Sequence, residues 1–445
     1  MTASPHAVDL RIDAHWIVPV APEGVLTGHA LIVDAGRIVA VLPAAVADAA
    51  YAPRERVALP SHALIPGFVN AHTHSAMTLL RGIADDVPLQ PWLTEHIWPR
   101  EGRFVAPEFV FDGTLLACAE MLRGGVTCCN DMYFHPEAAA RAYEVAGMRA
   151  LLGVPILDFP TPYAADADAY LARGLAARDA FKHVRELTFA LAPHAPYTVS
   201  DETWAKIVMF ARQLDLPIET HLAETQHEVD EALAKTGMTP LQRLDRLGAT
   251  GPGFIAIHGV HLSAPDIAML ARQECHVVHC PTSNMKLASG MAPVTALRAA
   301  GVNVALGTDG AASNNRLDVM SEMRHASLLA KVATGDAAAL PAGTTLAMAT
   351  LDGARALGLD AVTGSLTPGK DADVVAVDLS ALSLQPVFDP VSHLVNVAGR
   401  EAVSDVWVRG VRMVDRGALT TIDADALAAR VRAWQHKLAD TPHRS

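Results

Sequence analysis

The middle of the chain alternates short apolar runs with longer amphipathic stretches of helical character. This alternation is typical of βα units, in which each strand of a parallel sheet is followed by a helix. Eight such units predict an α/β fold of the closed (β/α)8 TIM-like type, whose active site is expected at the carboxyl ends of the strands. An open, doubly wound sheet is the alternative, but no G-x-G-x-x-G motif follows the first run. The eight runs are residues 64–74, 126–131, 150–158, 187–194, 217–221, 254–258, 275–279 and 302–309.

Both ends of the chain have a different, β-rich character. Residues 9–20 and 30–42 near the start resemble residues 372–378 and 405–410 near the other end in their content of β-branched side chains. Because a pair of strands is not stable alone, we expect both termini to meet in one small β-sandwich domain. The predicted boundaries are 1–65 for its first part, 66–367 for the barrel, and 368–445 for its second part with a terminal helix.

The composition excludes several classes of protein. A net charge of −13 and a pI near 5.8 argue against a nucleic-acid partner, because such proteins neutralise phosphates with basic patches. No apolar run reaches the roughly 18 residues that a membrane-spanning helix needs. The five cysteines include no C-x-x-C pair and indicate reduced thiols, and the opening residues lack the pattern of a secretory signal. We therefore expect a cytoplasmic protein without a membrane partner that binds a small molecule.

Histidines and one aspartate end several of the predicted strands. His72 and His74 close the first strand, His221 the fifth, His258 the sixth and Asp309 the eighth. Successive side chains of a strand point to opposite faces, so His72 and His74 share one side and can contact the same ion. A lone H-x-H would more simply be two polar residues at a strand end, but the later histidines and aspartate favour a metal site. Imidazole and carboxylate donors suit Zn²⁺, Fe²⁺ or Mn²⁺, with zinc as the default.

Glu224 lies three residues beyond His221. If the strand ends at His221 and a turn follows, the Glu224 carboxylate can reach back over the metal site and act as a general acid or base. The alternative is an ordinary glutamate at a helix N-terminus, where the helix dipole favours negative charge. The neighbouring ligand-type residues favour the first interpretation.

With these motifs, the chain resembles the amidohydrolase superfamily and, within it, the 5′-methylthioadenosine/S-adenosylhomocysteine deaminases. The resemblance covers essentially the whole chain, from residues 66–74 to residues 369–374. The H-x-H pair together with a late Gly-Thr-Asp is specific for the superfamily. The subgroup is indicated by His221 with Glu224 and by residues 77–82, 192–194, 256–258, 280–284 and 309–315.

The resemblance implies a role for each matching residue. The metal ligands would be His72, His74, His221 and Asp309. Glu224 would carry a proton to the ring nitrogen beside the attacked carbon, while His258 and Asp309 orient and deprotonate the water. Glu101 matches a position that holds ribose hydroxyls, and His194 one that faces the nucleoside. Binuclear members place a carboxylated lysine at the end of strand four, where this chain has no lysine, so we expect one metal per subunit.

The implied reaction is hydrolytic deamination of an adenine nucleoside by a metal-bound hydroxide, giving the inosine analogue and ammonia. Candidate substrates are 5′-methylthioadenosine, S-adenosylhomocysteine and adenosine. Family members that accept S-adenosylhomocysteine hold its carboxylate with arginines, whereas this chain has no arginine after strand three until Arg173, which favours the other two. Residues 81–103 form a candidate lid whose Trp92 and Trp98 either contact substrate or belong to the core.

Two alternatives to this function remain. One is a related amidohydrolase that acts on guanine, a triazine or a cyclic amide, since a shared scaffold does not determine the substrate. The other is a catalytically silent barrel, which the complete set of ligand-type residues disfavours. The family resemblance also implies a homo-oligomer, either a dimer or a tetramer.

Overall fold

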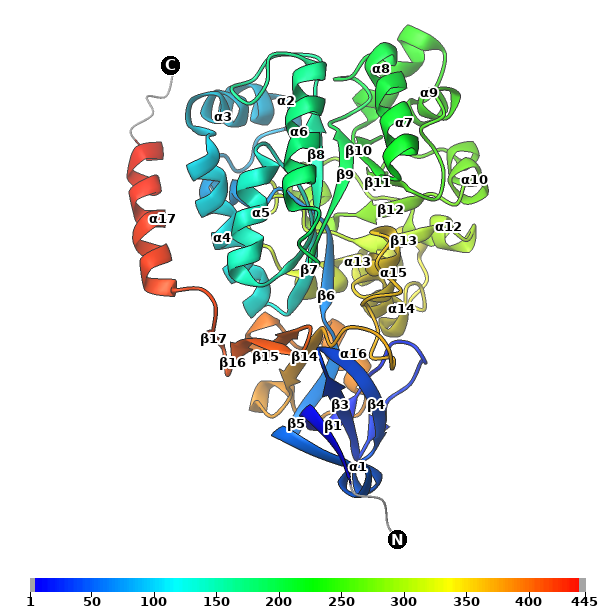
Figure 1. Cartoon of the computed structure of the whole chain (residues 1–445). Coiled ribbons are helices and arrows are strands. Elements are labelled where there is room, and N and C mark those ends of the chain that lie inside the picture. Colours follow the sequence, from blue (N-terminus) through cyan, green and yellow to red (C-terminus); the bar gives the residue numbers. More distant parts are fainter. Residues whose placement is uncertain (1–4, 440–445) are drawn as a thin grey trace.

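The computed structural model describes residues 5–439, and its central element is an eight-stranded parallel sheet (Figure 1). Each strand pairs with its sequence neighbours in order from β6 to β13. The side chains of β7 and β8 are buried on both faces, as expected where helices cover a parallel sheet. The strands are β6 (Phe68–Thr73), β7 (Val126–Met132), β8 (Arg149–Ile156), β9 (Leu187–Pro193), β10 (Ile218–Leu222), β11 (Phe254–His258), β12 (His276–His279) and β13 (Asn303–Leu306).

Hydrogen bonds between the first and last strands close this sheet into a barrel. The Asn70 side chain donates to Thr308 Oγ1 at 2.8 Å, and the Thr308 N–H donates to Asn70 Oδ1 at 2.9 Å. Beside them, the Asp309 N–H donates to the His72 carbonyl at 3.0 Å. The predicted (β/α)8 fold is therefore confirmed.

The first predicted strand, residues 64–74, is divided between two sheets. Its beginning is the end of β5 (Tyr51–Pro66) outside the barrel, and β6 starts only at Phe68. Gly67 stands at the junction, where a Cβ atom would lie 2.0 Å from Thr127 Oγ1. This close approach requires glycine and lets the chain turn from one sheet into the other.

Helices surround the barrel, and further helical segments follow its last strand. Between β6 and β13 lie η1 (Ser75–Leu80), α2 (Leu89–Pro91), η2 (Trp92–Ile97), α3 (Trp98–Phe104), α4 (Pro107–Arg123), α5 (Pro136–Ala146), α6 (Ala167–Phe181), α7 (Asp201–Leu214), α8 (Gln226–Thr236), α9 (Pro240–Arg246), α10 (Ala264–Arg272), α11 (Pro281–Lys286) and α12 (Val294–Ala299). After β13 come α13 (Val319–Thr334), α14 (Ala342–Met348), α15 (Leu351–Ala356), η3 (Leu382–Leu384), α16 (Pro390–Asn396) and η4 (Arg400–Ala402).

Strands from both termini form a second, mixed sheet of nine strands below the barrel in Figure 1. The two ends of the chain meet where β5 pairs antiparallel with β14, for example Pro66 opposite Val374. The predicted small β domain is confirmed, while the residue boundaries given above stay a prediction. Its other elements are β1 (His6–Ile17), β2 (Leu26–Thr27), β3 (His29–Asp34), β4 (Arg37–Pro43), α1 (Ala44–Ala50), β14 (Val374–Asp378), β15 (Val403–Val408), β16 (Val411–Asp415) and β17 (Ala418–Leu419).

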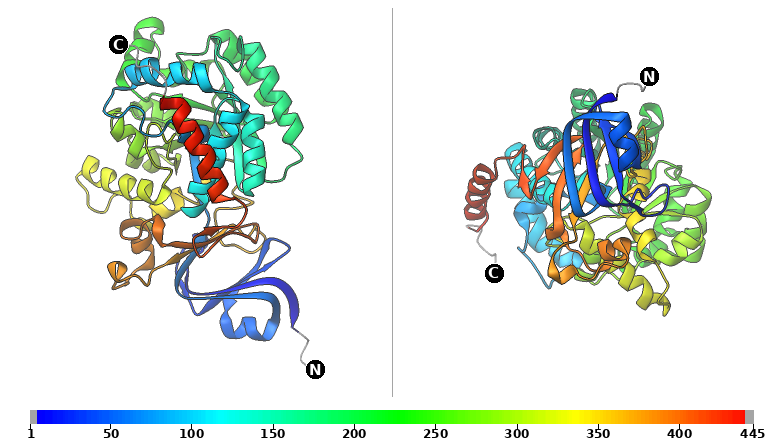
Figure 2. Two further views of the ribbon diagram at one scale, coloured as in Figure 1. Left: turned by 90° about the vertical axis from the view of Figure 1, so that its left-hand side faces the viewer. Right: turned by 90° about the horizontal axis from the view of Figure 1, so that it is seen from below.

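The last helix, α17 (Ala424–Ala439), leaves this sheet and packs along the barrel (Figure 2). Trp434 is its anchor, with its ring 5.3 Å from that of Phe109 and its Nε1 donating to Asp112 Oδ2 at 2.9 Å. Arg430 also pairs with Asp112, at 2.9 Å. The C-terminal helix therefore ties the β domain to the outer surface of α4.

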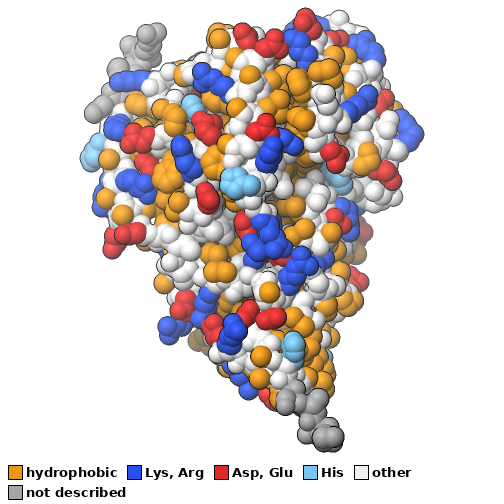
Figure 3. Space-filling view, viewed as in Figure 1, with side chains coloured by type: hydrophobic (Ala, Val, Ile, Leu, Met, Phe, Trp, Pro, Cys, Tyr) orange, Lys and Arg blue, Asp and Glu red, His pale blue; other side chains and the backbone are white. Residues whose placement is uncertain are grey.

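The surface gives two further results. On the face shown in Figure 3, acidic and basic side chains are interspersed, in keeping with the negative net charge and without a continuous basic area. None of the helices within residues 5–439 combines the length and apolar character needed to cross a membrane. The first four residues, part of the opening segment considered for a secretory signal, lie outside the described residues.

Candidate active site

The predicted ligand-type residues meet at the carboxyl ends of the barrel strands. His72 lies in β6, His221 in β10 and His258 at the end of β11, while His74 and Asp309 follow β6 and β13. The centre of the His72 ring lies 4.7 Å from that of His74 and 5.1 Å from that of His221. The His221 ring stacks on the His258 ring, with their centres 5.5 Å apart. Donor atoms fall into two overlapping groups, His72 with His221 and His258, and His72 with His74 and Asp309, each within 4.8 Å.

Backbone carbonyls orient two of the imidazoles. His74 Nδ1 lies 2.6 Å from the Met132 carbonyl, and His221 Nδ1 lies 2.7 Å from the His194 carbonyl. A carbonyl only accepts, so in both rings Nδ1 carries the proton. This arrangement leaves Nε2 of His74 and His221 turned toward the cluster, as in many metal-binding histidines.

Asp309 and His258 are held by side chains from neighbouring loops. Ser283 and Ser313 donate to Asp309 Oδ2 at 2.7 and 2.8 Å, so the second oxygen, Oδ1, faces the histidines. Asp309 Oδ1 lies 3.3 Å from His74 Nε2. On the other side of the cluster, Asn284 Oδ1 is 2.9 Å from His258 Nδ1. Asp309 Oδ1 also accepts from the Gly310 N–H at 2.7 Å, so both carboxylate oxygens are held in place.

His72 gives a direct indication that a cation fits here. The residue is fully buried, yet neither of its ring nitrogens has a hydrogen-bond partner among the described residues. A buried polar atom without a partner is costly, and a cation bound to it removes that cost. The imidazole and carboxylate donors of the two groups that share His72 suit zinc and related divalent metals.

The electrostatics of the cluster keep two of its imidazoles neutral, those of His72 and His221. Burial lowers the pKa of His72 to about 4 and that of His221 well below its ordinary value. For His74, burial also lowers the pKa, but the hydrogen bond and charge of Asp309 outweigh it and raise the pKa to about 9. Metal binding requires neutral imidazole, so at His74 a cation would compete with the proton that this ring shares with Asp309.

Glu224 lies two residues beyond the end of β10 and turns back toward the cluster. Its Oε2 is 3.9 Å from His258 Nε2, and the residue is buried. Burial raises the pKa of Glu224 above its ordinary value, with His258 opposing the shift. A carboxyl group with a raised pKa beside an imidazole can hold and release a proton near neutral pH.

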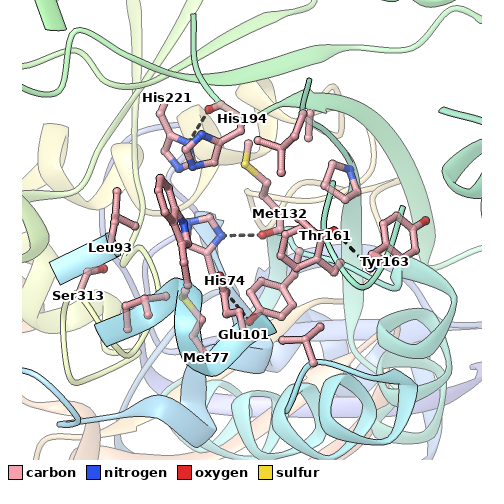
Figure 4. A pocket seen from close by; sticks show the side chains of 18 of the residues that line it. His74, Met77, Leu93, Glu101, Met132, Thr161, Tyr163, His194, His221 and Ser313 are labelled. Carbon is pink, nitrogen blue, oxygen red and sulfur yellow. Dashed lines mark hydrogen bonds between the residues drawn. The ribbon is translucent and has the colours of Figure 1, made fainter. Parts of the chain in front are cut away.

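A pocket of about 250 Å³ opens above this cluster (Figure 4). Its lining includes the four residues predicted to contact substrate, Trp92, Glu101, His194 and Glu224. Trp92 is buried, and its indole N–H has no partner among the described residues. In the predicted lid, residues 81–103, a stretch of turns over 81–88 is followed by consecutive short helical segments from Leu89 onward. The walls are mostly apolar and include Met77, Leu93, Ile97, Trp98, Met132, Phe134, Leu157, Phe159, Pro160, Pro162 and Tyr163.

Some residues of the site were not singled out from the sequence. Tyr133 donates from its hydroxyl to Glu101 Oε1 at 2.7 Å, and both residues line the pocket. The sequence could have indicated Tyr133 by its position just after the second predicted strand, because polar side chains that follow a barrel strand tend to line the site. Ser283, Asn284 and Ser313 were noted only as parts of motifs, and their bonds to Asp309 and His258 depend on loop geometry that a linear pattern does not show.

Comparison with known proteins agrees with this geometry. The model of the amidohydrolase family matches residues 63–413. The chain therefore belongs to the amidohydrolase family of metal-dependent hydrolases, as the sequence motifs predicted.

Within the family, the most similar proteins include a particular group of deaminases. The chain is 47% identical to a 5-methylthioadenosine/S-adenosylhomocysteine deaminase of Teredinibacter turnerae over 97% of this chain and 98% of that protein. It is 45% identical to a 5′-deoxyadenosine deaminase of Methanothermobacter thermautotrophicus over 81% and 84% of the two chains. A crystal structure of an adenosine deaminase from Xanthomonas campestris with bound zinc is 49% identical, covers 98% of this chain and 99% of its own, and superimposes with a TM-score of 0.96.

Proposed function

We propose that this chain deaminates adenine nucleosides by hydrolysis, releasing ammonia and the inosine analogue. The observation that carries the proposal is the cluster of histidines, Asp309 and Glu224 at the floor of a pocket large enough to admit a purine ring. The similarity over most or nearly all of the chain to proteins named as deaminases of methylthioadenosine and S-adenosylhomocysteine, of 5′-deoxyadenosine and of adenosine supports the choice of substrate class. It disfavours the alternatives of guanine, a triazine or a cyclic amide.

The metal site in this proposal consists of His72, His74, His221 and Asp309. The unpartnered nitrogens of His72 and the fixed tautomers of His74 and His221 support this set. We propose one zinc ion per subunit, with Fe²⁺ or Mn²⁺ as substitutes, because no lysine is present at the end of β9. When bound, such an ion supplies a water of lowered pKa that is nucleophilic near neutral pH.

Three side chains of the protein would move protons in this reaction. Water adds to C6 of the adenine ring, which accepts the electron pair only if a proton reaches the neighbouring ring nitrogen, and Glu224 is placed to supply it. His258 and Asp309 orient the water and take its proton. Ammonia then leaves as the C6–N bond breaks, after Asp309 returns a proton to the amino group. As ammonia leaves, the C6 hydroxyl becomes the carbonyl of the inosine analogue and its proton returns to Glu224, so the new C6–O bond and the lost C6–N bond balance and each side chain regains its starting protonation state.

The remaining pocket residues would hold the nucleoside. We propose that Glu101 accepts from the ribose hydroxyls, that His194 faces the nucleoside, and that Trp92 provides both an aromatic surface and its free N–H. Burial lowers the pKa of His194 to about 4, so it would act as a neutral group. The Glu101 carboxylate is oriented by Tyr133, as described above.

The end of the pocket formed by the β8–α6 loop favours an uncharged 5′ substituent. Among the described residues lining the pocket there is no lysine or arginine. Arg173 instead lies over the Tyr163 ring, 5.5 Å from its centre, and is not part of the lining. A buried carboxylate without a cationic partner is unfavourable, so we propose a preference for methylthioadenosine or adenosine over S-adenosylhomocysteine.

The test is to give zinc-replete protein methylthioadenosine, S-adenosylhomocysteine, adenosine and guanine in parallel. Ammonia release and the accompanying change in ultraviolet absorbance are measured for each. We expect turnover of the adenine nucleosides, a fall in kcat of at least about 100-fold in Glu224→Gln, and no loss in Glu202→Gln, an exposed glutamate on α7. No turnover of any adenine nucleoside by metal-replete protein would refute the function. Equal kcat/KM for S-adenosylhomocysteine and methylthioadenosine would refute only the argument about the 5′ substituent. Assembly as a dimer or tetramer and a cytoplasmic location remain predictions.

A further inference from the structure

The turn that carries Glu224 is held by a second buried carboxylate, that of Glu228. The Ala223 N–H donates to Glu228 Oε1 at 2.9 Å, and the Glu224 N–H donates to Glu228 Oε2 at 3.0 Å. Ala223 has a φ of 49°, in the left-handed region that a residue with a side chain adopts only under constraint. Both oxygens of one carboxylate therefore hold two successive amides of a strained turn.

Helix capping is the ordinary explanation for a glutamate at this position. Helix α8 begins after Thr225, whose Oγ1 accepts from the Glu228 N–H at 3.2 Å, and T-x-x-E is the pattern of a capping box. In a capping box, however, the glutamate accepts from the N–H of the cap residue itself. Here the Glu228 carboxylate reaches past Thr225 to the two residues before it, so its bonds serve the turn in front of the helix.

The turn is also anchored from the opposite side. The Ala223 carbonyl accepts from the His261 N–H at 2.9 Å, and the Leu222 carbonyl accepts from the Gly259 N–H at 3.1 Å. These bonds attach the carbonyls of the turn to the loop that follows His258, whose imidazole lies near Glu224. The N–H groups of Ala223 and Glu224 donate to Glu228 instead, which is buried and is not part of the pocket lining.

We infer that Glu228 is a positioning residue for the reaction, which sets the place of the Glu224 carboxyl group by holding the amides of residues 223 and 224. It contacts no substrate in this role. The inference rests on the proposed function, because it requires Glu224 to transfer a proton. Proton transfer needs donor and acceptor within hydrogen-bond distance, and a misplacement of about 1 Å can cost a factor of about 100 in rate.

Glu228→Gln tests this inference in the full-length, zinc-loaded protein. The amide offers one acceptor oxygen, and its NH₂ group would face one of the two backbone N–H groups. We expect kcat for methylthioadenosine to fall about 10- to 100-fold, while KM changes by less than about threefold because the pocket walls are intact. Zinc content should stay near that of the unchanged protein, and the thermal midpoint should fall only by the few degrees that the loss of about one buried hydrogen bond causes. The matched control is Glu231→Gln on the same helix, whose exposed carboxylate pairs only with Lys235 among the described residues.

The outcomes separate this inference from the proposed function. If the unchanged protein deaminates adenine nucleosides and Glu224→Gln does not, but Glu228→Gln keeps its kcat, the positioning role is refuted and the function stands. A large fall in zinc content and in the thermal midpoint together with a rise in KM would also refute it, since that result indicates a general structural role. If Glu228→Gln does not fold, Glu228→Asp replaces it: one methylene shorter, its carboxylate cannot accept from both amides, and kcat should fall without a change in KM. No turnover by the unchanged protein would instead remove the proposed function itself.

Discussion

Removing the Tyr133 hydroxyl should weaken substrate binding without disturbing the pocket wall. The hydroxyl donates to Glu101 Oε1 at 2.7 Å, and both residues are buried. Tyr133→Phe removes one oxygen atom and keeps the ring, whose contacts are with Phe134 and His74. A hydrogen bond to a charged group contributes about 1.5–3 kcal/mol, which corresponds to a factor of about 10 to 150 in an equilibrium constant.

We expect this loss to fall mainly on KM. Glu101 is proposed to hold the ribose, which does not react, so its contact is equally strong in the ground and transition states and affects KM rather than kcat. Burial raises the pKa of Glu101 and the Tyr133 bond lowers it, so the variant carboxyl should have a still higher pKa. The increase in KM should therefore be larger at pH 6 than at pH 8, because more of the carboxyl is protonated at the lower pH.

The assay is steady-state deamination of adenosine and of 2′,3′-dideoxyadenosine by Tyr133→Phe. The dideoxy analogue lacks the hydroxyls that Glu101 is proposed to accept from, so its KM should be nearly insensitive to the substitution. Tyr51→Phe, in the small β domain, is the control for loss of a tyrosine hydroxyl. An adenosine KM within about twofold of the unchanged protein, or an equal increase for both substrates, would show that the reasoning is wrong.

Two further predictions concern stability. Burial raises the pKa of Glu322 to about 7, so the stability that this carboxyl contributes is present below about pH 4.5 and is lost as pH rises through about 7. Between pH 5 and 8, the free energy of unfolding of Glu322→Gln in urea should therefore rise relative to that of the unchanged protein. A difference between the two proteins that stays constant with pH would contradict this. Trp434→Ala should lower the free energy of unfolding by about 3–5 kcal/mol, the usual cost of removing a buried tryptophan, while kcat/KM stays the same because α17 lies outside the pocket. A fall in kcat/KM of the folded Trp434→Ala variant would contradict this second prediction.

The barrel and its ligand-type residues could be predicted because each depends on local pattern. Alternating apolar runs and helical stretches indicate βα units wherever they occur, and a polar residue at the end of such a run lies at one known edge of the sheet. His72, His221, His258 and Asp309 were all predicted on this basis, and the structure brings them together. The first run was taken as one strand because the bend at Gly67 depends on contact with Thr127 of another strand.

The supporting residues could not be predicted in the same way, because their partners are distant in sequence or their pattern has a simpler explanation. Tyr133 and Glu101 come from different βα units, and only the folded chain shows that they form a hydrogen bond. Glu228 has the sequence of a capping box, and its unusual reach to the amide of Ala223 depends on a backbone conformation that sequence spacing does not specify.

The seam between β6 and β13 has a consequence for how the protein matures. Asn70 and Thr308, which bond across it, are 238 residues apart, and three of the proposed metal ligands, His72, His74 and Asp309, lie beside them in or just after the same two strands. A ribosome therefore releases His72 and His74 long before Asp309 is made. The complete set of four proposed donors exists only after the last strand has docked against the first, so the site as proposed would be finished late in folding, after the closure of the barrel.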